Sequence, residues 1–229
     1  MGRGLFGVLG PSMIGPSSSH TAGAARIGLM CRSVAQCDVS EVTFFLHGSF
    51  ATTYKGHGTD RALVGGLLGM QTDDERIIHS LEIAKQKGIK VNFVKTDLGN
   101  VHPNTVEAVM TNKNGETSSV VASSVGGGEI NLVSVNGFHA DLSGYYNALI
   151  IRHLDKVGMI SKITALFEKH DINIVSLSNN REGKGKIAIT IIEMDGESNK
   201  ELLSELSSIE DVYTAVSYTH LTLPTILLV

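Results

Sequence analysis

The run Gly15–Thr21 carries three consecutive serines followed by a histidine and a threonine. A helix is predicted to begin at Thr21, at the end of this run. Its free backbone amides and the positive end of its dipole would add hydrogen-bond donors to those of Ser17, Ser18, Ser19 and His20. Each of these groups can hydrogen-bond an anion, which suits a carboxylate or phosphate ligand. The alternative is a serine-capped helix start followed by a surface histidine, and composition alone favours it.

His57 is a second candidate, because it stands between Gly56 and Gly58. Glycines let the backbone approach a ligand closely, and an imidazole titrates near neutral pH, so His57 could act as a general base. Thr59 or Asp60 could orient its ring or cap the next helix. A plain turn histidine fits the same pattern, and periodicity does not separate the two interpretations.

Two further segments have the same polar character. Pro103 fixes the chain between His102 and Asn104. The segment Ser123–Gly128 ends in three glycines that could form an anion-binding nest of backbone amides. Each signal is weak alone, but four loops rich in His, Ser and Gly are unusual in a purely structural domain.

Several other classes of site are not indicated. The sequence has no GxxxxGK[ST] run, no GxGxxG run opening a helix after a strand, and no zinc-spaced Cys or His pair. Its two cysteines, Cys31 and Cys37, cannot supply the four thiolates of a [4Fe–4S] cluster, and they favour a reducing cytoplasm. The net charge of −4 argues against nucleic acid or an anionic membrane as partner. No signal peptide or membrane-spanning run is recognised.

A mixed α/β domain over residues 1–146 is predicted to position these loops. Helical periodicity and stop signals predict helices at Thr21–Ser33, at Asp60–Gly69 with Asp60 as cap, and at Asp74–Gly88 ended by Gly88. Alternating and β-branched residues predict strands at Glu41–Leu46, Lys90–Lys95, Val106–Thr111, Ser119–Ser123 and Glu129–Val135. The turn Asn112–Gly115 is expected to close a hairpin.

Residues 147–217 have the element order βαββαβ, the ferredoxin-like arrangement, so the fold class is α+β. Strands are predicted at Ala148–His153, Ile172–Asn179, Ile187–Met194 and Val212–Ser217. Helices are predicted at Val157–His170 and at Ser198–Ser207, the latter capped by Ser198. The predicted fold is complete without the apolar stretch 218–229, which is interpreted as an extra tail.

This second block resembles an ACT domain, a module that senses amino acids. The resemblance is carried by the element order and by the turns Asp155–Gly158 and Asp171–Ile174. It implies a ligand near Gly158 and Asn173, where helix amides face an anion. Val157 stands where such domains usually have proline, so a dimerisation module without a ligand remains the alternative.

Over residues 3–217 the sequence resembles the β chain of the bacterial iron–sulfur L-serine dehydratases. The matching stretches are Ile14–Leu29, Gly48–Gly69, Thr72–Ile77, Val101–Thr105 and Ser123–Ile130. The resemblance implies that the first block is an allosteric-substrate-binding-type domain. It also implies an α chain that holds an oxygen-labile [4Fe–4S] cluster, and a homodimer formed through the ACT domain.

The chemistry implied by the resemblance is a lyase reaction of amino-acid catabolism and gluconeogenesis. One iron of the partner's cluster would act as a Lewis acid toward the serine hydroxyl, and a base would remove the Cα proton. Aminoacrylate would then hydrolyse to pyruvate and ammonia, with no pyridoxal phosphate.

The resemblance also assigns roles to residues of this chain. His57 is expected to be the base, with Thr59 nearby, and His20 and His102 complete the expected catalytic set. The substrate-binding set is expected to be Ser17, Ser18, Ser19, Thr21, Thr59 and Asn104. No metal ligand is expected on this chain.

Two alternatives belong to other functional classes. One is a regulatory protein that senses serine without chemistry of its own. The other is a dimerising scaffold whose polar loops are only structural.

Overall fold

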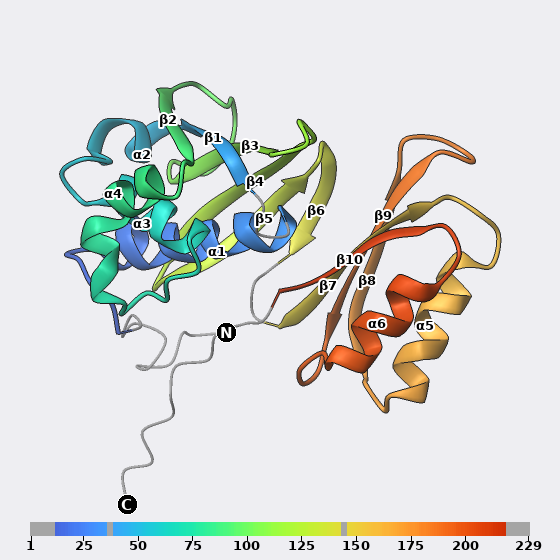
Figure 1. The fold of residues 1–229 in the computed structure, drawn as a ribbon. Coiled ribbons are helices and arrows are strands. Elements are labelled where there is room, and N and C mark those ends of the chain that lie inside the picture. Colours follow the sequence, from blue (N-terminus) through green and yellow to red (C-terminus); the bar gives the residue numbers. More distant parts are fainter. Residues whose placement is uncertain (1–11, 36–38, 143–145, 219–229) are drawn as a thin grey trace, which may run out of the picture. The chain divides into compact units, whose positions relative to one another are not determined.

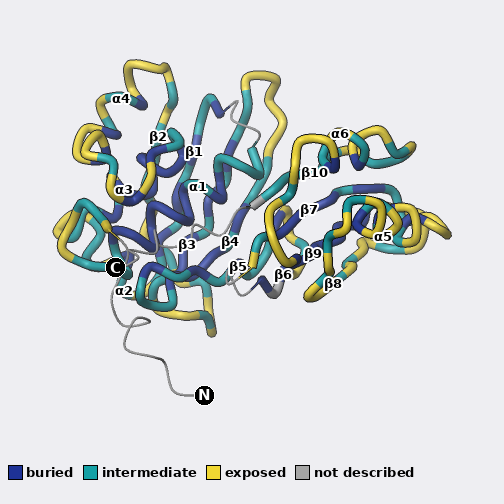
Figure 2. Tube along the Cα trace, turned by 90° about the horizontal axis from the view of Figure 1, so that it is seen from below, coloured by how far each residue is buried: buried dark blue, intermediate teal, exposed yellow. Residues whose placement is uncertain are grey.

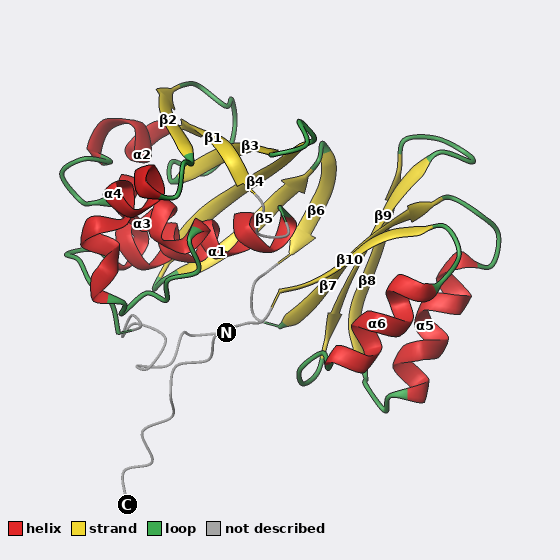
Figure 3. Ribbon diagram, viewed as in Figure 1, coloured by secondary structure: helices red, strands yellow, loops and turns green. Residues whose placement is uncertain are grey.

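The computed structural model describes residues 12–35, 39–142 and 146–218. The described residues up to Gly137 form one compact unit, and those from Phe138 onward form a second (Figure 1). Helices and sheets occur together in both halves of the chain, which confirms the predicted α+β class (Figure 3). The domain boundary at residues 146 and 147 stays a prediction. Tyr218 ends the last strand, and residues 219–229 of the expected tail lie outside the described part.

The larger sheet has the strand order β2-β1-β3-β4-β5-β6. Its strands are β1 (Val39–Leu46), β2 (Lys90–Lys95), β3 (Thr105–Asn112), β4 (Thr117–Gly126), β5 (Glu129–Val135) and β6 (Phe138–Leu142). β1 and β2 run parallel, whereas β1–β3, β3–β4 and β4–β5 are antiparallel. All five strands predicted for this part are present, and β6 was not predicted.

One face of this sheet is apolar and covered by helices. Along β1, Val42, Phe44 and Leu46 are fully buried while the residues between them are partly exposed (Figure 2). The helices are α1 (Ala24–Val34), α2 (Gly48–Thr53), α3 (Thr59–Leu67) and α4 (Ser80–Gln86), with a π-helical turn η2 (Ser18–Gly23) and a 3₁₀ turn η3 (Glu75–His79). α1 packs on β4 and β5. The period-2 pattern therefore places the core between the sheet and these helices.

Helices α1 and α3 approach each other with their backbones almost in contact. A Cβ atom at Gly28 would lie 2.2 Å from the carbonyl oxygen of Leu63, and one at Gly66 would lie 2.0 Å from the carbonyl oxygen of Ala25. No side chain larger than hydrogen fits at either position. The two glycines thus set the spacing at which the helices cross.

Two predicted helix starts differ in detail. Asp60 is not the cap of α3: the N-cap is Gly58, which is left-handed (φ 69°), and Asp60 lies in the first turn. The predicted helix Asp74–Gly88 is divided into η3 and α4, with the Asp74 carboxylate accepting the amide of Arg76 (2.9 Å). Gly88 follows α4 with φ +74°, so the predicted stop is confirmed.

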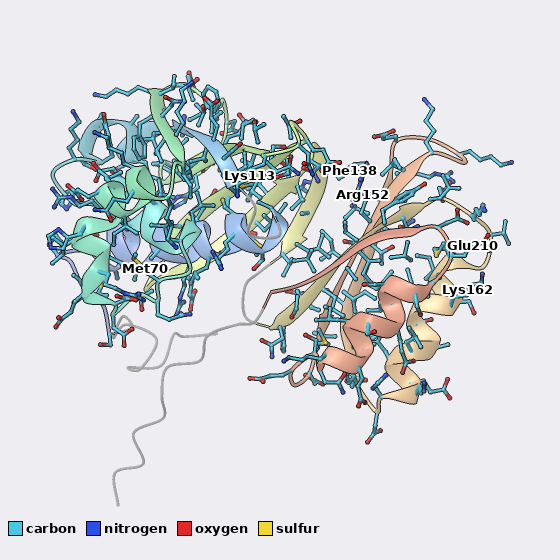
Figure 4. The ribbon with its side chains drawn as sticks, in the orientation of Figure 1. Met70, Lys113, Phe138, Arg152, Lys162 and Glu210 are labelled. Carbon is cyan, nitrogen blue, oxygen red and sulfur yellow. The ribbon has the colours of Figure 1, made fainter. Side chains whose placement is uncertain are left out.

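The smaller sheet has four antiparallel strands in the order β10-β7-β9-β8. Its elements follow the predicted βαββαβ order, namely β7 (Asn147–Leu154), α5 (Met159–Lys169), β8 (Ile174–Arg181), β9 (Ile187–Met194), α6 (Lys200–Ser208) and β10 (Val212–Tyr218). One core joins the helices to the sheet and comprises Leu149, Ile151, Met159, Ile163, Phe167, Ile192, Met194, Leu202 and Leu206. Lys162 of α5 lies outside this core and is exposed (Figure 4).

The cap of α6 is one residue later than predicted. Asn199, not Ser198, is the N-cap, and its side-chain oxygen accepts the amide of Leu202 (2.7 Å). The Ser198 hydroxyl instead hydrogen-bonds that of Ser217 (2.6 Å). Serine and asparagine both favour the N-cap position, so the sequence could not decide between Ser198 and Asn199.

Candidate functional site

The serine-rich run forms the first turn of a helix rather than a loop before it. Ser18–Gly23 is π-helical and continues directly into α1. Ser17 is its N-cap, and the Ser17 hydroxyl oxygen accepts the backbone amide of His20 (3.2 Å). The predicted cap and the predicted polar site therefore coincide, and π-helical turns are frequent at functional sites.

His20 is held by contacts at both ring nitrogens. Its Nε2 lies 2.9 Å from the Ser49 hydroxyl oxygen, and its Nδ1 lies 3.4 Å from that of Ser17. Phe50 meets the ring edge-on at a centroid distance of 5.3 Å. Partial burial, and secondarily the neighbouring His57, lower the pKa of His20. The imidazole is thus oriented and biased toward its neutral form.

His57 lies beside His20, although the two come from separate segments. Their ring centroids are 5.0 Å apart. The Thr21 hydroxyl donates to the carbonyl oxygen of His57 (3.2 Å), so the first turn of the helix holds the loop between α2 and α3. Thr21 is almost fully buried and uses its hydroxyl within the protein. The structure therefore brings two of the three predicted catalytic histidines together.

Buried polar atoms without a hydrogen-bond partner occur in the segments that carry this site. Within the described residues they include His57 Nδ1 and the hydroxyls of Thr59 and Ser124, all of them buried. Buried polar groups normally have partners, so such atoms call for an explanation. Ser18 and Ser19 are half-buried in the same turn. These segments therefore carry several groups that could hydrogen-bond a polar ligand.

Gly23 explains how Ser124 of β4 reaches the first helical turn. A Cβ atom at Gly23 would lie 2.0 Å from the Ser124 hydroxyl oxygen and 2.7 Å from its Cβ. The glycine therefore admits the serine side chain directly against the helix backbone.

Gly23→Ala is expected to destabilise the chain by about 2 kcal/mol, because the added methyl overlaps Ser124. In an ordinary helix the same change would stabilise by up to about 1 kcal/mol. Urea unfolding of Gly23→Ala, Ser124→Gly and the double variant should give a coupling of at least about 1 kcal/mol. Additive effects would show that the two residues do not clash.

The start of α2 is joined to the segment that contains His102. Gly48 has φ +54°, and a Cβ atom there would lie 2.6 Å from the carbonyl oxygen of Pro103. That carbonyl accepts the amide of Ser49 (2.8 Å). Only glycine permits both this conformation and this contact, and the arrangement fixes Ser49 against the His102 segment.

His102 and Asn104 shape this segment themselves. His102 is exposed, and its Nδ1 accepts the amide of Asn104 (3.1 Å). The Asn104 carbonyl accepts the amide of Ser124 (2.9 Å), and its side-chain amide reaches the Ser124 carbonyl (3.4 Å). Asn104 is thus tied to Ser124, whereas no contact of His102 with the other two histidines is found among the described residues.

The glycine run after Ser124 is a tight turn between β4 and β5. Gly126, Gly127 and Gly128 all have positive φ. The carbonyl of Gly128 accepts from the buried guanidinium of Arg26 on α1 (2.8 Å). The Gly128 carbonyl of this turn therefore anchors α1 through Arg26.

The predicted ACT ligand residues lie at the turns expected for them. Gly158 is the left-handed N-cap of α5 (φ 85°). The Asn173 side-chain amide donates to Asp195 (2.8 Å). Asp155 accepts from Arg181 (2.8 Å), and this hydrogen bond lowers the pKa of Asp155. Ligand binding at these residues stays a prediction.

Two contributors to the site were not predicted from the sequence. Ser49 was not predicted to touch His20, and Ser124 was considered only as part of a glycine-rich loop. The pair Gly48-Ser49 was the available signal, because glycine adopts positive φ readily and often marks a tight turn of the chain. Neither the partner of Ser49 nor that of Gly23 could be read from spacing.

The described residues offer no evident metal centre. No group of three or more His, Cys, Asp or Glu side chains within residues 12–35, 39–142 and 146–218 is placed to hold an ion. Burial raises the pKa of the Cys31 thiol to about 12, which opposes a thiolate ligand. Cys37 lies outside the described residues.

Comparison with known proteins matches both parts of the chain. A family model described as serine dehydratase beta chain matches residues 12–87, and one described as ACT domain matches residues 147–211. The "L-serine dehydratase, beta chain" of Peptoniphilus asaccharolyticus is 43% identical over 211 residues, which are 92% of this chain and 95% of that protein. The "Probable L-serine dehydratase, beta chain" of Bacillus subtilis is 42% identical over 210 residues, with the same two shares. The D-3-phosphoglycerate dehydrogenase of Bacillus subtilis is 24% identical over 190 residues, covering 82% of this chain and 36% of that protein.

Proposed function

Because the chain belongs to the family of L-serine dehydratase beta chains, we propose that it supplies the acid–base half of a site that deaminates L-serine to pyruvate and ammonia. The reaction is that of an L-serine ammonia-lyase. The partner is an α chain, as the relatives' designation as beta chains implies. Activity is expected only when both chains are present.

The observation that carries this proposal is the pair His20–His57, with ring centroids 5.0 Å apart. Deamination begins with removal of the Cα proton, which needs a base that is unprotonated near neutral pH. We assign this role to His57. His20, whose pKa is lowered, stays neutral and does not oppose the protonation of His57 with a like charge.

The hydroxyl-rich turn suits the substrate carboxylate. Ser17, Ser18 and Ser19 lie at a helix start where amides and hydroxyls both donate to anions. We propose that these serines bind the carboxylate, that Thr21 fixes the His57 loop, and that Thr59, Asn104 and His102 border the substrate. The buried, unpaired hydroxyls of Thr59 and Ser124 support this placement.

The iron–sulfur cluster of the proposed reaction does not fit on the described residues of this chain. Cys31 is buried with a raised pKa, and no ligand group is found among the described residues. We propose that the α chain supplies the ligands of a [4Fe–4S] cluster. Pyridoxal phosphate has no part in the proposed chemistry.

The ACT domain is proposed to form the contact between two copies of this chain and to sense an amino acid near Gly158 and Asn173. Among the described helices none is long and apolar enough to cross a membrane. We propose a cytoplasmic location, where the two cysteines stay reduced.

Anaerobic co-expression with the α chain tests this function. The purified pair, loaded with iron, should form pyruvate and ammonia from L-serine, and either chain alone should not. A pair that binds L-serine without turnover would support the regulatory sensor instead. A pair that neither binds nor converts L-serine would contradict both functions.

A further inference from the structure

We propose that Ser49 is a positioning residue that holds His20 in the tautomer with its proton on Nε2. In this arrangement the Ser49 hydroxyl oxygen accepts from Nε2–H. The catalytic consequence rests on the proposed function. The tautomer itself is a property of this chain alone.

The hydrogen bonds at the other ring nitrogen favour this tautomer. The Ser17 hydroxyl oxygen accepts the backbone amide of His20 (3.2 Å), and the same oxygen lies 3.4 Å from Nδ1. A hydroxyl that already accepts one hydrogen bond becomes a better donor. Ser17 can therefore donate its hydrogen to Nδ1, and this leaves the ring proton on Nε2, 2.9 Å from Ser49. With the ring proton on Nδ1, two N–H groups would converge on the Ser17 oxygen and its own hydrogen would need another acceptor.

Ser49 is itself fixed by contacts that leave its hydroxyl free to face His20. Its amide donates to the Pro103 carbonyl (2.8 Å). Its carbonyl accepts from the hydroxyls of Thr52 (3.0 Å) and Thr53 (2.7 Å). Among the described residues, His20 is the one hydrogen-bond partner of the Ser49 side chain. The serine is therefore a rigid support for the ring, not a mobile surface hydroxyl.

The imidazole is confined by its ring neighbours as well. Phe50, next to Ser49 on α2, meets it edge-on with an interplanar angle of 70°. His57 lies at 5.0 Å with a tilt of 39°. Ser17 and Phe50 still confine the ring when Ser49 is lost, so the loss acts mainly on the ring proton, which no longer has an acceptor at Nε2.

Nitrogen NMR of the imidazole in the full chain tests the tautomer directly. At a pH where His20 is neutral, the wild-type chain should show the proton on Nε2. Ser49→Ala should give a mixture of tautomers, whereas Ser49→Thr should restore the wild-type pattern. Ser207→Ala is the matched control, because Ser207 is an exposed serine of α6 whose hydroxyl donates to the backbone carbonyl of Leu203 (2.8 Å).

Turnover by the α-chain complex gives the second readout. Ser49→Ala should lower kcat roughly tenfold, the size expected for one lost hydrogen bond, and Ser49→Thr should recover most of it. A wild-type His20 protonated on Nδ1, or a tautomer unchanged by Ser49→Ala, would overturn the inference even if the complex is active. An inactive complex with the expected tautomers would instead contradict the proposed function and leave the role of Ser49 in the chain established.

Discussion

Gly66→Ala is expected to destabilise the first unit by at least about 3 kcal/mol. A methyl group at this position would lie 2.0 Å from the carbonyl oxygen of Ala25 and 2.7 Å from the amide nitrogen of Leu29. Both are backbone atoms of α1, so no side chain can move aside, and the helices must separate. Overpacking usually costs about 1–3 kcal/mol, and a backbone clash belongs at or above the upper end.

The direction of the stability change separates a backbone clash from the usual effect of alanine in a helix. Glycine to alanine within a helix otherwise stabilises by about 1 kcal/mol. Thermal unfolding should show a clear decrease in melting temperature for Gly66→Ala and also for Gly28→Ala. Gly183→Ala is the control, since its Cβ would meet only the Lys186 side chain at 3.6 Å, and it should melt close to wild type. A Gly66→Ala chain as stable as wild type would show that α1 and α3 are further apart than described.

His57→Asn is expected to lower kcat of the α-chain complex on the order of 1,000-fold, the range of a lost general base. Asparagine keeps the polarity and approximate size of the side chain but cannot accept the Cα proton. Binding of L-serine should change little, because the carboxylate is assigned to the serines of the first helical turn. Steady-state kinetics and equilibrium binding on iron-matched complexes measure the two quantities separately.

His79→Asn serves as the matched control for His57→Asn. His79 is exposed at the end of η3 and has no part in the proposed site. Turnover near the wild-type value is expected. Near-normal turnover by His57→Asn would remove His57 from the chemistry, and loss of serine binding would make it a binding residue instead.

Strands were the part of the fold that the sequence predicted best. Lys90–Lys95, Glu129–Val135 and Ile187–Met194 have the predicted bounds, because β-branched and alternating residues follow the period of a half-buried strand. Helix α2 was missed, since its six residues include two threonines and a phenylalanine, which do not favour a helix. Its start is set by Gly48 against Pro103, a tertiary contact.

The candidate site was predicted as residue types but not as contacts. His20 and His57 were both named from their loops, yet only the packing of α2 beside the first helical turn shows that their rings meet. Ser49 and Gly23 act through partners in distant segments, His20 and Ser124. A local pattern cannot show which loops share one edge of a fold, so these partnerships could not be read from the sequence.

We propose that His57 of this chain removes the Cα proton of L-serine in the two-chain enzyme. The deuterium isotope effect on pyruvate formation from L-serine labelled at Cα tests this role directly when wild-type and His57→Asn complexes are compared. We predict a larger isotope effect in the variant, because slower proton removal makes that step limit the rate. Slower turnover with an isotope effect no larger than that of the wild type would contradict this role, since His57 would then act in a different step.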